Sequence, residues 1–316
     1  MDGSVRRSPR FSVQLQAQRT TWPEYIAAVR AVEELGFHGV WNLDHMLPFD
    51  GADDGPCFET WTTLAAMAAS TNRIRLGSLV NGVIYRDPAT LAKSAVMVDQ
   101  ISNGRFEFAL GAAWAEREFR AYGLPFPPIG ERMDRLEETL TIVKSLWTLP
   151  RTTFKGVYYT MNDAPCEPKP VQRPYPPILI GGTGARTLRK AARHADEWNG
   201  VASPETARSC IEQLRANCGA IGRDFNELTL SIHPQLFIDR DHDRAEGWGL
   251  ALAESQGKQA EAERGKWLIG TPAEVRSQIG RFTELGISHF IMAVGAPFDL
   301  DALRLFADEV LAPLSN

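Results

Sequence analysis

The chain has 316 residues, of which 44% are hydrophobic, so it can bury the core of one large α/β domain or of two ordinary ones. Its formal net charge is −5 and its Lys and Arg residues are scattered, which argues against nucleic acid as a partner. No stretch approaches the roughly 18 apolar residues of a membrane span, and FSVQLQAQ near the start is too polar for a signal-peptide core, so we expect a cytoplasmic protein without a membrane contact.

Short runs rich in Val, Ile, Leu and Phe recur along the chain and predict β-strands. They occupy residues 11–16, 38–43, 74–80, 105–110, 177–181, 197–202, 228–238 and 288–294. Helical patterns lie between them, and several begin at a typical N-cap, namely Thr21 with Glu24, Asp87 before Pro88, Ser203 before Pro204, and Thr271-Pro272 with Glu274.

Two of the returns from helix to strand share one design. Leu35-Gly36 and Leu285-Gly286 each let a helix end in a left-handed residue and enter a strand at once. Strands that alternate in this way with helices predict an α/β protein, a single (β/α)8 TIM barrel over residues 1–316. Its active site is then expected in the loops that follow the strands.

Two segments do not fit the simple repeat. Residues 150–176 contain six prolines and form an insertion after the fourth helix, and residues 239–268 are polar with a helical pattern and form an insertion after the seventh strand. Insertions of this length are often lids or walls of a site. Either segment could equally be a solvated flap or a contact between subunits.

No metal site is expected. Cys57, Cys166, Cys210 and Cys218 show neither Cys-x-x-Cys spacing nor a His partner at the separation of a zinc ligand. We interpret all of them as free thiols.

The first chemical signal is the segment GVWNLDHMLPFDG at residues 39–51, where an apolar run stops on Asp44 and His45. At the carboxyl end of a barrel strand the two side chains lie at the mouth of the barrel, which favours a functional role. The alternative is a structural turn in which Asp44 satisfies its neighbour His45.

The second signal is the sequence Gly181-Gly182-Thr183-Gly184, where a strand runs into a helix. Backbone amides at such a turn receive phosphate groups. No Lys-Ser/Thr pair follows as in a Walker loop, and Thr187 stands where the third glycine of a dinucleotide motif belongs. The alternative is that the glycines only permit a tight turn.

The third signal follows the fourth strand, where Gly111, Ala112 and Ala113 allow a close approach to the backbone before Trp114. Trp114, Glu118 and Tyr122 are candidates for site residues because they fall just after the strand, and Trp114 is the strongest of them. Further on, helical spacing predicts a buried structural stripe of Met133, Leu136, Leu140, Val143 and Leu146.

Several blocks of sequence resemble a known family when they are taken together and in order. WNLDHMLP, LGSLVNGVIYRDPATLAK, DQISNGRFEFALGAAW, YGLPFPPIGERMDRLEETL and EPKPVQRPYPPILIGGTGARTLRKAARHADEWN are similar to the luciferase-like monooxygenase superfamily. The similarity is greatest to its actinobacterial branch of deazaflavin (coenzyme F420)-dependent oxidoreductases. It extends in register from about residue 11 to about residue 225.

The resemblance implies a cofactor site. Asp44 and His45 would lie against the deazaflavin ring, a non-prolyl cis peptide bond at about Ser78-Leu79 would lie behind it, and Asn81 would line the same wall. The loop Gly111, Ala112, Ala113 and Trp114 would line the cofactor, and Gly181, Gly182 and Thr183 would bind its phosphate.

The sequence departs from the family in two places. Residues Asn81-Gly82-Val83 replace the Thr-Asn-Pro of many relatives, so the wall there is expected to be reshaped. Trp114 stands where the sugar-phosphate dehydrogenases of the superfamily have an acidic residue, so their acid–base chemistry does not carry over.

The resemblance implies hydride transfer between C5 of the deazaflavin and a small organic substrate. His45 would deliver or accept the accompanying proton, and Asp44 would orient it or instead bond a loop amide. An FMN-dependent monooxygenase and a non-catalytic flavin-binding barrel remain open. The substrate is expected to be chosen by residues 47–60, 150–176 and 239–268, and a homodimer through the barrel helices is possible, although no residue identifies that face.

Overall fold

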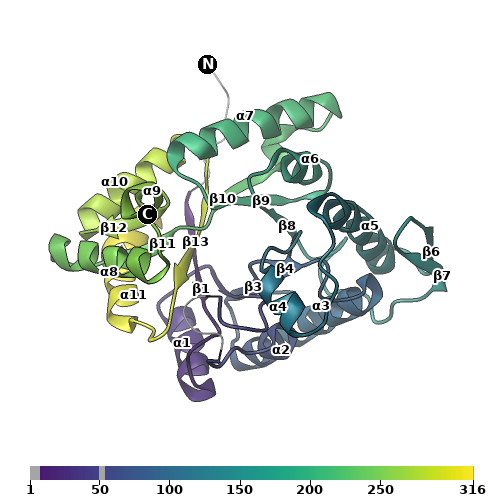
Figure 1. Cartoon of the computed structure of the whole chain (residues 1–316), viewed down its shortest axis with the longest axis horizontal. Coiled ribbons are helices and arrows are strands. Elements are labelled where there is room, and N and C mark those ends of the chain that lie inside the picture. Colours follow the sequence, from purple (N-terminus) through teal and green to yellow (C-terminus); the bar gives the residue numbers. More distant parts are fainter. Residues whose placement is uncertain (1–7, 50–53, 316) are drawn as a thin grey trace.

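The computed structural model describes residues 8–49 and 54–315, and this part of the chain folds into a closed barrel of eight parallel strands (Figure 1). The strands follow one another around the barrel in chain order, and β13 closes it against β1 over Arg10–Leu15. The barrel strands are β1 (Arg10–Leu15), β2 (Gly39–Asn42), β3 (Arg75–Ser78), β5 (Phe106–Gly111), β8 (Ile178–Gly181), β9 (Glu197–Gly200), β10 (Thr229–Ile232) and β13 (His289–Val294). The predicted TIM barrel is confirmed.

Helices surround the barrel and connect its strands (Figure 1). They are α1 (Trp22–Glu34), α2 (Thr60–Ser70), α3 (Pro88–Ser102), α4 (Glu116–Ala121), α5 (Ile129–Thr148), α6 (Ala185–His194), α7 (Pro204–Ala220), α8 (His242–Ser255), α9 (Ala260–Arg264), α10 (Pro272–Thr283), α11 (Leu300–Phe306) and α12 (Ala312–Ser315). A 3₁₀ turn, η1 (Phe225–Glu227), and a π-helical turn, η2 (Ala307–Leu311), complete them. No helix in the described ranges has both the length and the hydrophobicity needed to cross a bilayer.

The predicted helix boundaries are confirmed where capping residues defined them. The Ser203 hydroxyl accepts from the Thr206 amide, Asp87 accepts from the Ala89 amide, and Glu274 accepts from the amide of the N-cap Thr271. The two Leu-Gly returns also behave as expected, because Gly36 has φ +81° and Gly286 has φ +88°. Local sequence therefore determines where these helices start and stop.

One predicted strand divides into two. Residues 228–238 form β10 and then β11 (Gln235–Ile238), with His233-Pro234 between them. Strand β11 leaves the barrel wall, pairs with β13 only at Gln235↔Ala293, and carries an extra parallel strand, β12 (Trp267–Gly270). The sequence pattern did not predict β12, because its four residues lie between polar segments with a helical pattern. A two-residue strand, β4 (Asn81–Gly82), also pairs with β5.

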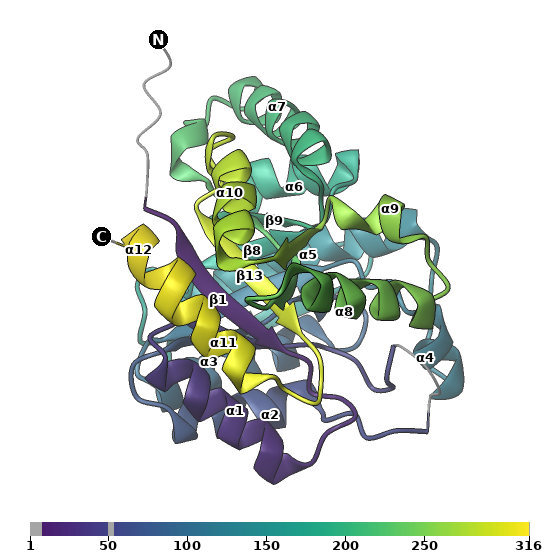
Figure 2. The same ribbon diagram turned by 90° about the vertical axis from the view of Figure 1, so that its left-hand side faces the viewer.

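The two insertions have different positions. Residues 150–176 contain an antiparallel hairpin, β6 (Thr152–Lys155) and β7 (Thr160–Ala164), which projects from the right-hand side of Figure 1. The Glu138 carboxylate on α5 holds its turn by accepting from the amides of Val157, Tyr158 and Tyr159. Residues 239–268 form α8, α9 and the start of β12. Helices α4, α8 and α9 lie on the side toward which β1 runs (Figure 2).

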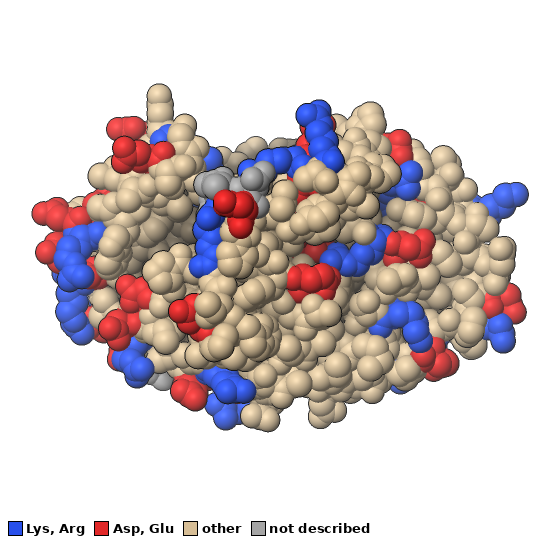
Figure 3. Space-filling model, turned by 60° about the horizontal axis from the view of Figure 1, so that its bottom comes forward, with Lys and Arg blue, Asp and Glu red and all other residues tan. Residues whose placement is uncertain are grey.

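The predicted structural residues behave as expected. Met133, Leu136, Leu140, Val143 and Leu146 of α5 are all buried in the main core. The four cysteines are free thiols. On the face shown in Figure 3, basic and acidic side chains are interspersed, as the small net charge leads one to expect.

Candidate active site

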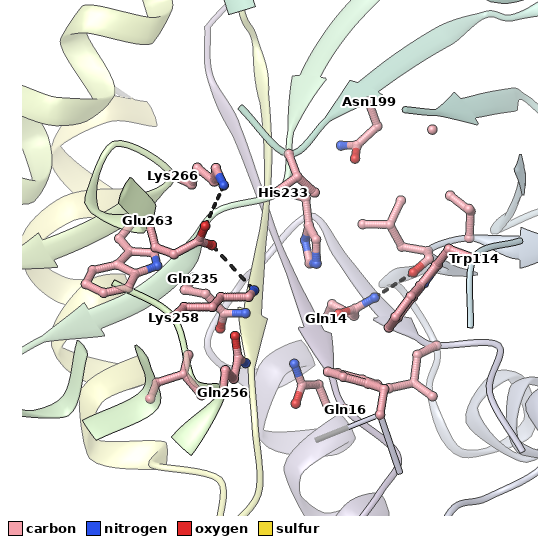
Figure 4. A pocket seen from close by; sticks show the side chains of 18 of the residues that line it. Gln14, Gln16, Trp114, Asn199, His233, Gln235, Gln256, Lys258, Glu263 and Lys266 are labelled. Carbon is pink, nitrogen blue, oxygen red and sulfur yellow. Dashed lines mark hydrogen bonds and ion pairs between the residues drawn. The ribbon is translucent and has the colours of Figure 1, made fainter. Parts of the chain in front are cut away.

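A cavity of about 690 Å³ lies at the carboxyl ends of the barrel strands (Figure 4). Residues at the ends of β1, β2, β3, β5, β8, β9 and β10, or in the loops that follow them, form one side of it, and the second insertion forms the other. The predicted site residues His45, Leu79, Trp114, Gly181, Gly182 and Thr183 line it. No residue of the first insertion is among the described residues that line this cavity, so of the two insertions only the second is a wall of the site.

His45 is held by a carboxylate from another loop. Its Nδ1 lies 2.7 Å from Oε1 of Glu118, a buried residue of α4. Glu118 also accepts from the Met46 amide at 2.6 Å and from the Tyr85 hydroxyl at 2.5 Å. Burial raises the pKa of Glu118, but the hydrogen bonds from His45, Met46 and Tyr85 outweigh burial and lower it. The carboxylate therefore stays ionised and fixes the imidazole, with Nε2 left for a ligand.

Asp44 has a different place from His45. It is buried behind the cavity, where both of its oxygens accept from Arg86 at 3.0 and 2.9 Å. It also accepts from the Thr60 hydroxyl at 2.7 Å and from the Gly82 amide at 2.9 Å. Of the two arrangements considered for Asp44, the structure therefore has the one in which it bonds a loop amide, and the residue that orients His45 is Glu118.

The wall after β3 contains a non-prolyl cis peptide bond, but it joins Leu79 to Val80 and not Ser78 to Leu79. The expected position was one residue too early because the Leu79 amide still donates to the Asn42 carbonyl, which extends the β2–β3 ladder by one residue. Ser78 and Asn81 are fully buried rather than exposed to the cavity, and Asn81 donates to the Ala109 carbonyl at 2.9 Å.

Two glycines of the site make room for Val80. A Cβ on Gly111 would lie 2.7 Å from Cγ2 of Val80, and a Cβ on Gly181 would lie 3.0 Å from its Cγ1. The sequence predicted a close approach to the backbone at Gly111 without identifying the group that makes it, and the resemblance implied that this loop lines the cofactor. The structure assigns the close approach to the valine that itself lines the cavity.

The backbone after Gly111 presents Trp114. The carbonyls of Ala112 and Ala113 accept from Arg132 at 3.2 and 2.6 Å, and Ala113 has φ +60°. Trp114 is 65% exposed, and its ring centroid lies 5.3 Å from that of His45 in an edge-to-face arrangement. Ala112 and Ala113 thus shape the loop, and Trp114 is the residue that lines the cavity.

In the glycine turn after β8, the backbone amide and carbonyl of Gly182 already make hydrogen bonds with other residues of the protein. The Gly182 amide donates to the Asn199 carbonyl at 2.9 Å, and the Gly182 carbonyl accepts from the Trp198 indole at 2.8 Å. A phosphate would therefore meet Thr183 and the first-turn amides of α6, which have no partner within their helix.

Polar residues in the barrel strands and just after them were missed. Gln14, Gln16, Asn199, His233 and Gln235 line the cavity (Figure 4). Gln14 and Gln16 interrupt the apolar run FSVQLQ, a signal that could have identified them. Lys258, Glu263 and Lys266 of the second insertion were missed as well, and Glu263 lies 2.7 Å from Lys266 and 3.6 Å from Lys258.

His233 is held in one orientation. Its Nδ1 lies 2.6 Å from the Ile291 carbonyl, which can only accept, so Nδ1 carries the proton. Burial lowers the pKa of His233 more than this hydrogen bond raises it. The ring is therefore neutral and points into the cavity beside Gln14 (Figure 4).

A cavity with converging polar groups at the carboxyl face of a TIM barrel is the usual active-site position of this class of enzyme. The luciferase-like monooxygenase family matches residues 1–266, and the chain belongs to that family. The protein is thus an enzyme of the luciferase-like superfamily.

Its relatives use two kinds of cofactor. An FMNH(2)-dependent dimethylsulfone monooxygenase from Pseudomonas putida is 27% identical over 85% of this chain and 83% of its own length. An F420-dependent glucose-6-phosphate dehydrogenase from Amycolatopsis mediterranei is 28% identical over 91% of this chain and 92% of its own. An F420-dependent secondary alcohol dehydrogenase has the same fold, with a TM-score of 0.86, 21% identity, and coverage of 98% of this chain and 100% of that one.

Proposed function

We propose that this protein is an F420-dependent oxidoreductase that transfers a hydride between the deazaflavin and a small organic substrate at the mouth of the barrel. The observation that carries the proposal is the pair of His45 and Glu118, which fixes an imidazole at the cavity wall with one ring nitrogen left for a ligand. F420-dependent enzymes among the relatives support the choice of cofactor.

The cavity fits a deazaflavin. Leu79 and Val80 give it an apolar wall for a ring, and its volume lies within the range of cofactor sites. Thr183 and the start of α6 suit a phosphate, because helix N-termini bind anions. When bound, the deazaflavin would supply hydride transfer at C5.

The residues of the chain would supply the rest of the chemistry. His45 would donate or accept a proton at Nε2 while Glu118 stabilises its charged form. Trp114 would cover the reacting atoms and reduce their contact with water. Asp44 would hold the loops behind the cavity without contacting the substrate.

Cofactor titration tests the proposal. Protein purified from a host without the deazaflavin should bind added F420 more tightly than FMN, as read by fluorescence quenching. It should then oxidise reduced F420 with at least one member of a panel of enones, imines and nitroarenes.

Two other outcomes correspond to the alternatives. A clear preference for FMN would identify a flavin-dependent monooxygenase, which the Pseudomonas relative supports. Tight F420 binding without turnover across the panel would indicate a non-catalytic flavin-binding barrel. The homodimer and the cytoplasmic location stay predictions, and light scattering and cell fractionation test them.

A further inference from the structure

A second cavity, of about 560 Å³, lies next to the first. It is lined by β11, α8, α11, the segment that follows β1 and the loop after β13. Gln16, Gln235, Leu252 and Gln256 line both cavities, so the side chains of these residues stand between the two. Figure 4 shows Gln16, Gln235 and Gln256 at this side of the first cavity.

The second cavity is lined mainly by apolar side chains. They include Leu236 and Phe237 of β11, Trp248 of α8, and Phe298 and Leu303 near and on α11. The polar residues of its lining, besides the glutamines of the boundary, are Gln18, Arg19 and Asp299. The carboxylate of Asp299 is turned to the backbone, where it accepts from the Ala302 amide at 2.9 Å as the cap of α11. A cavity of this size with apolar walls binds apolar groups, because burial removes their surface from water.

The glutamines at the boundary add a second requirement. A primary amide both donates and accepts hydrogen bonds, so it can solvate a carbonyl or a hydroxyl group. A ligand that spans the boundary would therefore have its carbonyl or hydroxyl group in the first cavity, which the glutamines and His45 both line, and an apolar body beyond the glutamines.

We propose that the second cavity binds the apolar body of the substrate while the reacting group lies in the first cavity near His45. The substrate class is then a carbonyl compound or alcohol that carries an extended alkyl or aryl group. This inference rests on the proposed function for the identity of the reacting group, but the binding of the apolar body can be measured without turnover.

The experiment uses the full-length protein, saturated with oxidised F420, and a series of methyl ketones from 2-butanone to 2-nonanone. Dissociation constants are measured by saturation-transfer NMR. Each added methylene should lower the dissociation constant by about threefold to fourfold, as expected for burial of one methylene, until the cavity is full. A dissociation constant that does not change with chain length would overturn the proposal.

Two substitutions of Ala by Phe locate the binding. Ala302→Phe fills the second cavity from α11 and should remove most of the dependence on chain length, with at least tenfold weaker binding of 2-nonanone. Ala251→Phe places the same ring on α8 at an exposed position outside both cavities and should behave as wild type. Equal effects of the two substitutions, or no effect of Ala302→Phe, would contradict the assignment.

Two further measurements keep the outcomes separate. Trp248→Ala removes one wall at a partly exposed position and should also weaken binding of the long ketones if Ala302→Phe fails to fold. The F420 dissociation constant should stay within about twofold of wild type in both variants, and a larger loss would place this cavity in the cofactor site instead. If wild-type protein fails to bind F420, and the same titration without the cofactor still shows the dependence on chain length, the proposed function fails and the apolar site remains.

Discussion

At the residue scale, the site depends on one histidine and the carboxylate that holds it. His45→Ala should lower single-turnover hydride transfer by about two to four orders of magnitude, the usual range for a lost general acid or base. His45→Phe, which keeps a ring but has no nitrogen, should be similarly slow. The F420 dissociation constant should change much less in both variants. A folded, cofactor-saturated His45→Ala enzyme with the wild-type rate would refute the catalytic role.

Glu118 should act through His45 rather than on the substrate. Glu118→Gln removes a charge that accepts several hydrogen bonds, so we expect turnover to fall by about 10- to 100-fold, which corresponds to one or two charged hydrogen bonds. The pH–rate profile should also change, because the variant lacks the carboxylate whose pKa the hydrogen bond from His45 lowers. Asp would keep the charge on a shorter side chain, so Glu118→Asp should recover part of the loss. A lower melting temperature with an unchanged pH profile would indicate only a structural role.

At the element scale, the turn between β8 and α6 is more constrained than its glycines suggested. Gly182 has φ +130°, and a Cβ there would lie 3.2 Å from Cγ2 of Thr187. Gly182→Val should therefore destabilise the fold by about 1–3 kcal/mol in addition to any effect on the cofactor. It cannot test the anion site by itself.

Thr183→Val is a cleaner test of the same turn. Thr183 is exposed and lines the cavity, and Val keeps its shape while removing the hydroxyl. If this turn binds the phosphate, the F420 dissociation constant should rise by about threefold to tenfold, the equivalent of one hydrogen bond. The urea unfolding midpoint should stay at its wild-type value. Unchanged affinity would show that the phosphate does not contact this hydroxyl.

The loops behind the cavity are joined by the ion pair of Asp44 and Arg86. Arg86→Met should lower the free energy of unfolding by about 3–5 kcal/mol, because it leaves a buried carboxylate without its cation. Urea unfolding measures the change. Adding Asp44→Asn to Arg86→Met should recover part of the loss, since the unpaired charge is then removed. If Arg86→Met alone is as stable as wild type, the hydrogen bonds from Thr60 and Gly82 are sufficient to stabilise the buried Asp44 carboxylate.

Some features of the fold and of the site could be predicted from the sequence, and others could not. Caps such as Ser203 and left-handed ends such as Gly36 are local, so a few residues of sequence determine them. The contact of His45 with Glu118 joins residues 73 positions apart, and it depends on how α4 packs over the mouth. The position of the cis bond depends on strand register, which changes by a single residue without any change in composition.

At the scale of the whole molecule, one end of the barrel carries the candidate active site and the other end contributes to stability. The end opposite the cavity is closed by a buried polar network in which His289 lies 2.7 Å from the Ser12 hydroxyl and 2.8 Å from Glu197. This arrangement resembles a hydrolytic triad, but Ser12 and His289 are fully buried and no substrate can reach the hydroxyl. The network therefore stabilises the fold and has no part in catalysis, as expected for the amino-terminal face of a TIM barrel.

His38 borders this network and should make the stability of the barrel depend on pH. Burial, followed by the nearby charges of His289, Arg10 and Arg75, lowers the pKa of His38 from 6.5 to about 3. Arg10 also donates to its Nε2 at 3.3 Å, which requires that nitrogen to be unprotonated.

The direction of this pH dependence follows from the difference in proton binding between the folded and the unfolded chain. Between pH 6.5 and pH 3 the unfolded chain protonates this histidine and the folded chain does not, so stability is complete above pH 6.5 and is lost as the pH falls. From pH 7 to pH 5 we expect this one group to remove about 2 kcal/mol from the free energy of unfolding. In His38→Asn the loss over that interval should be smaller by that amount, as measured by urea unfolding at the two pH values. His242 is the control, because it is exposed and its hydrogen bond with Glu274 raises its pKa, so His242→Asn should not reduce the acid loss. If His38→Asn and wild type lose equal stability between pH 7 and pH 5, the pH dependence of the barrel arises from its buried carboxylates and not from this histidine.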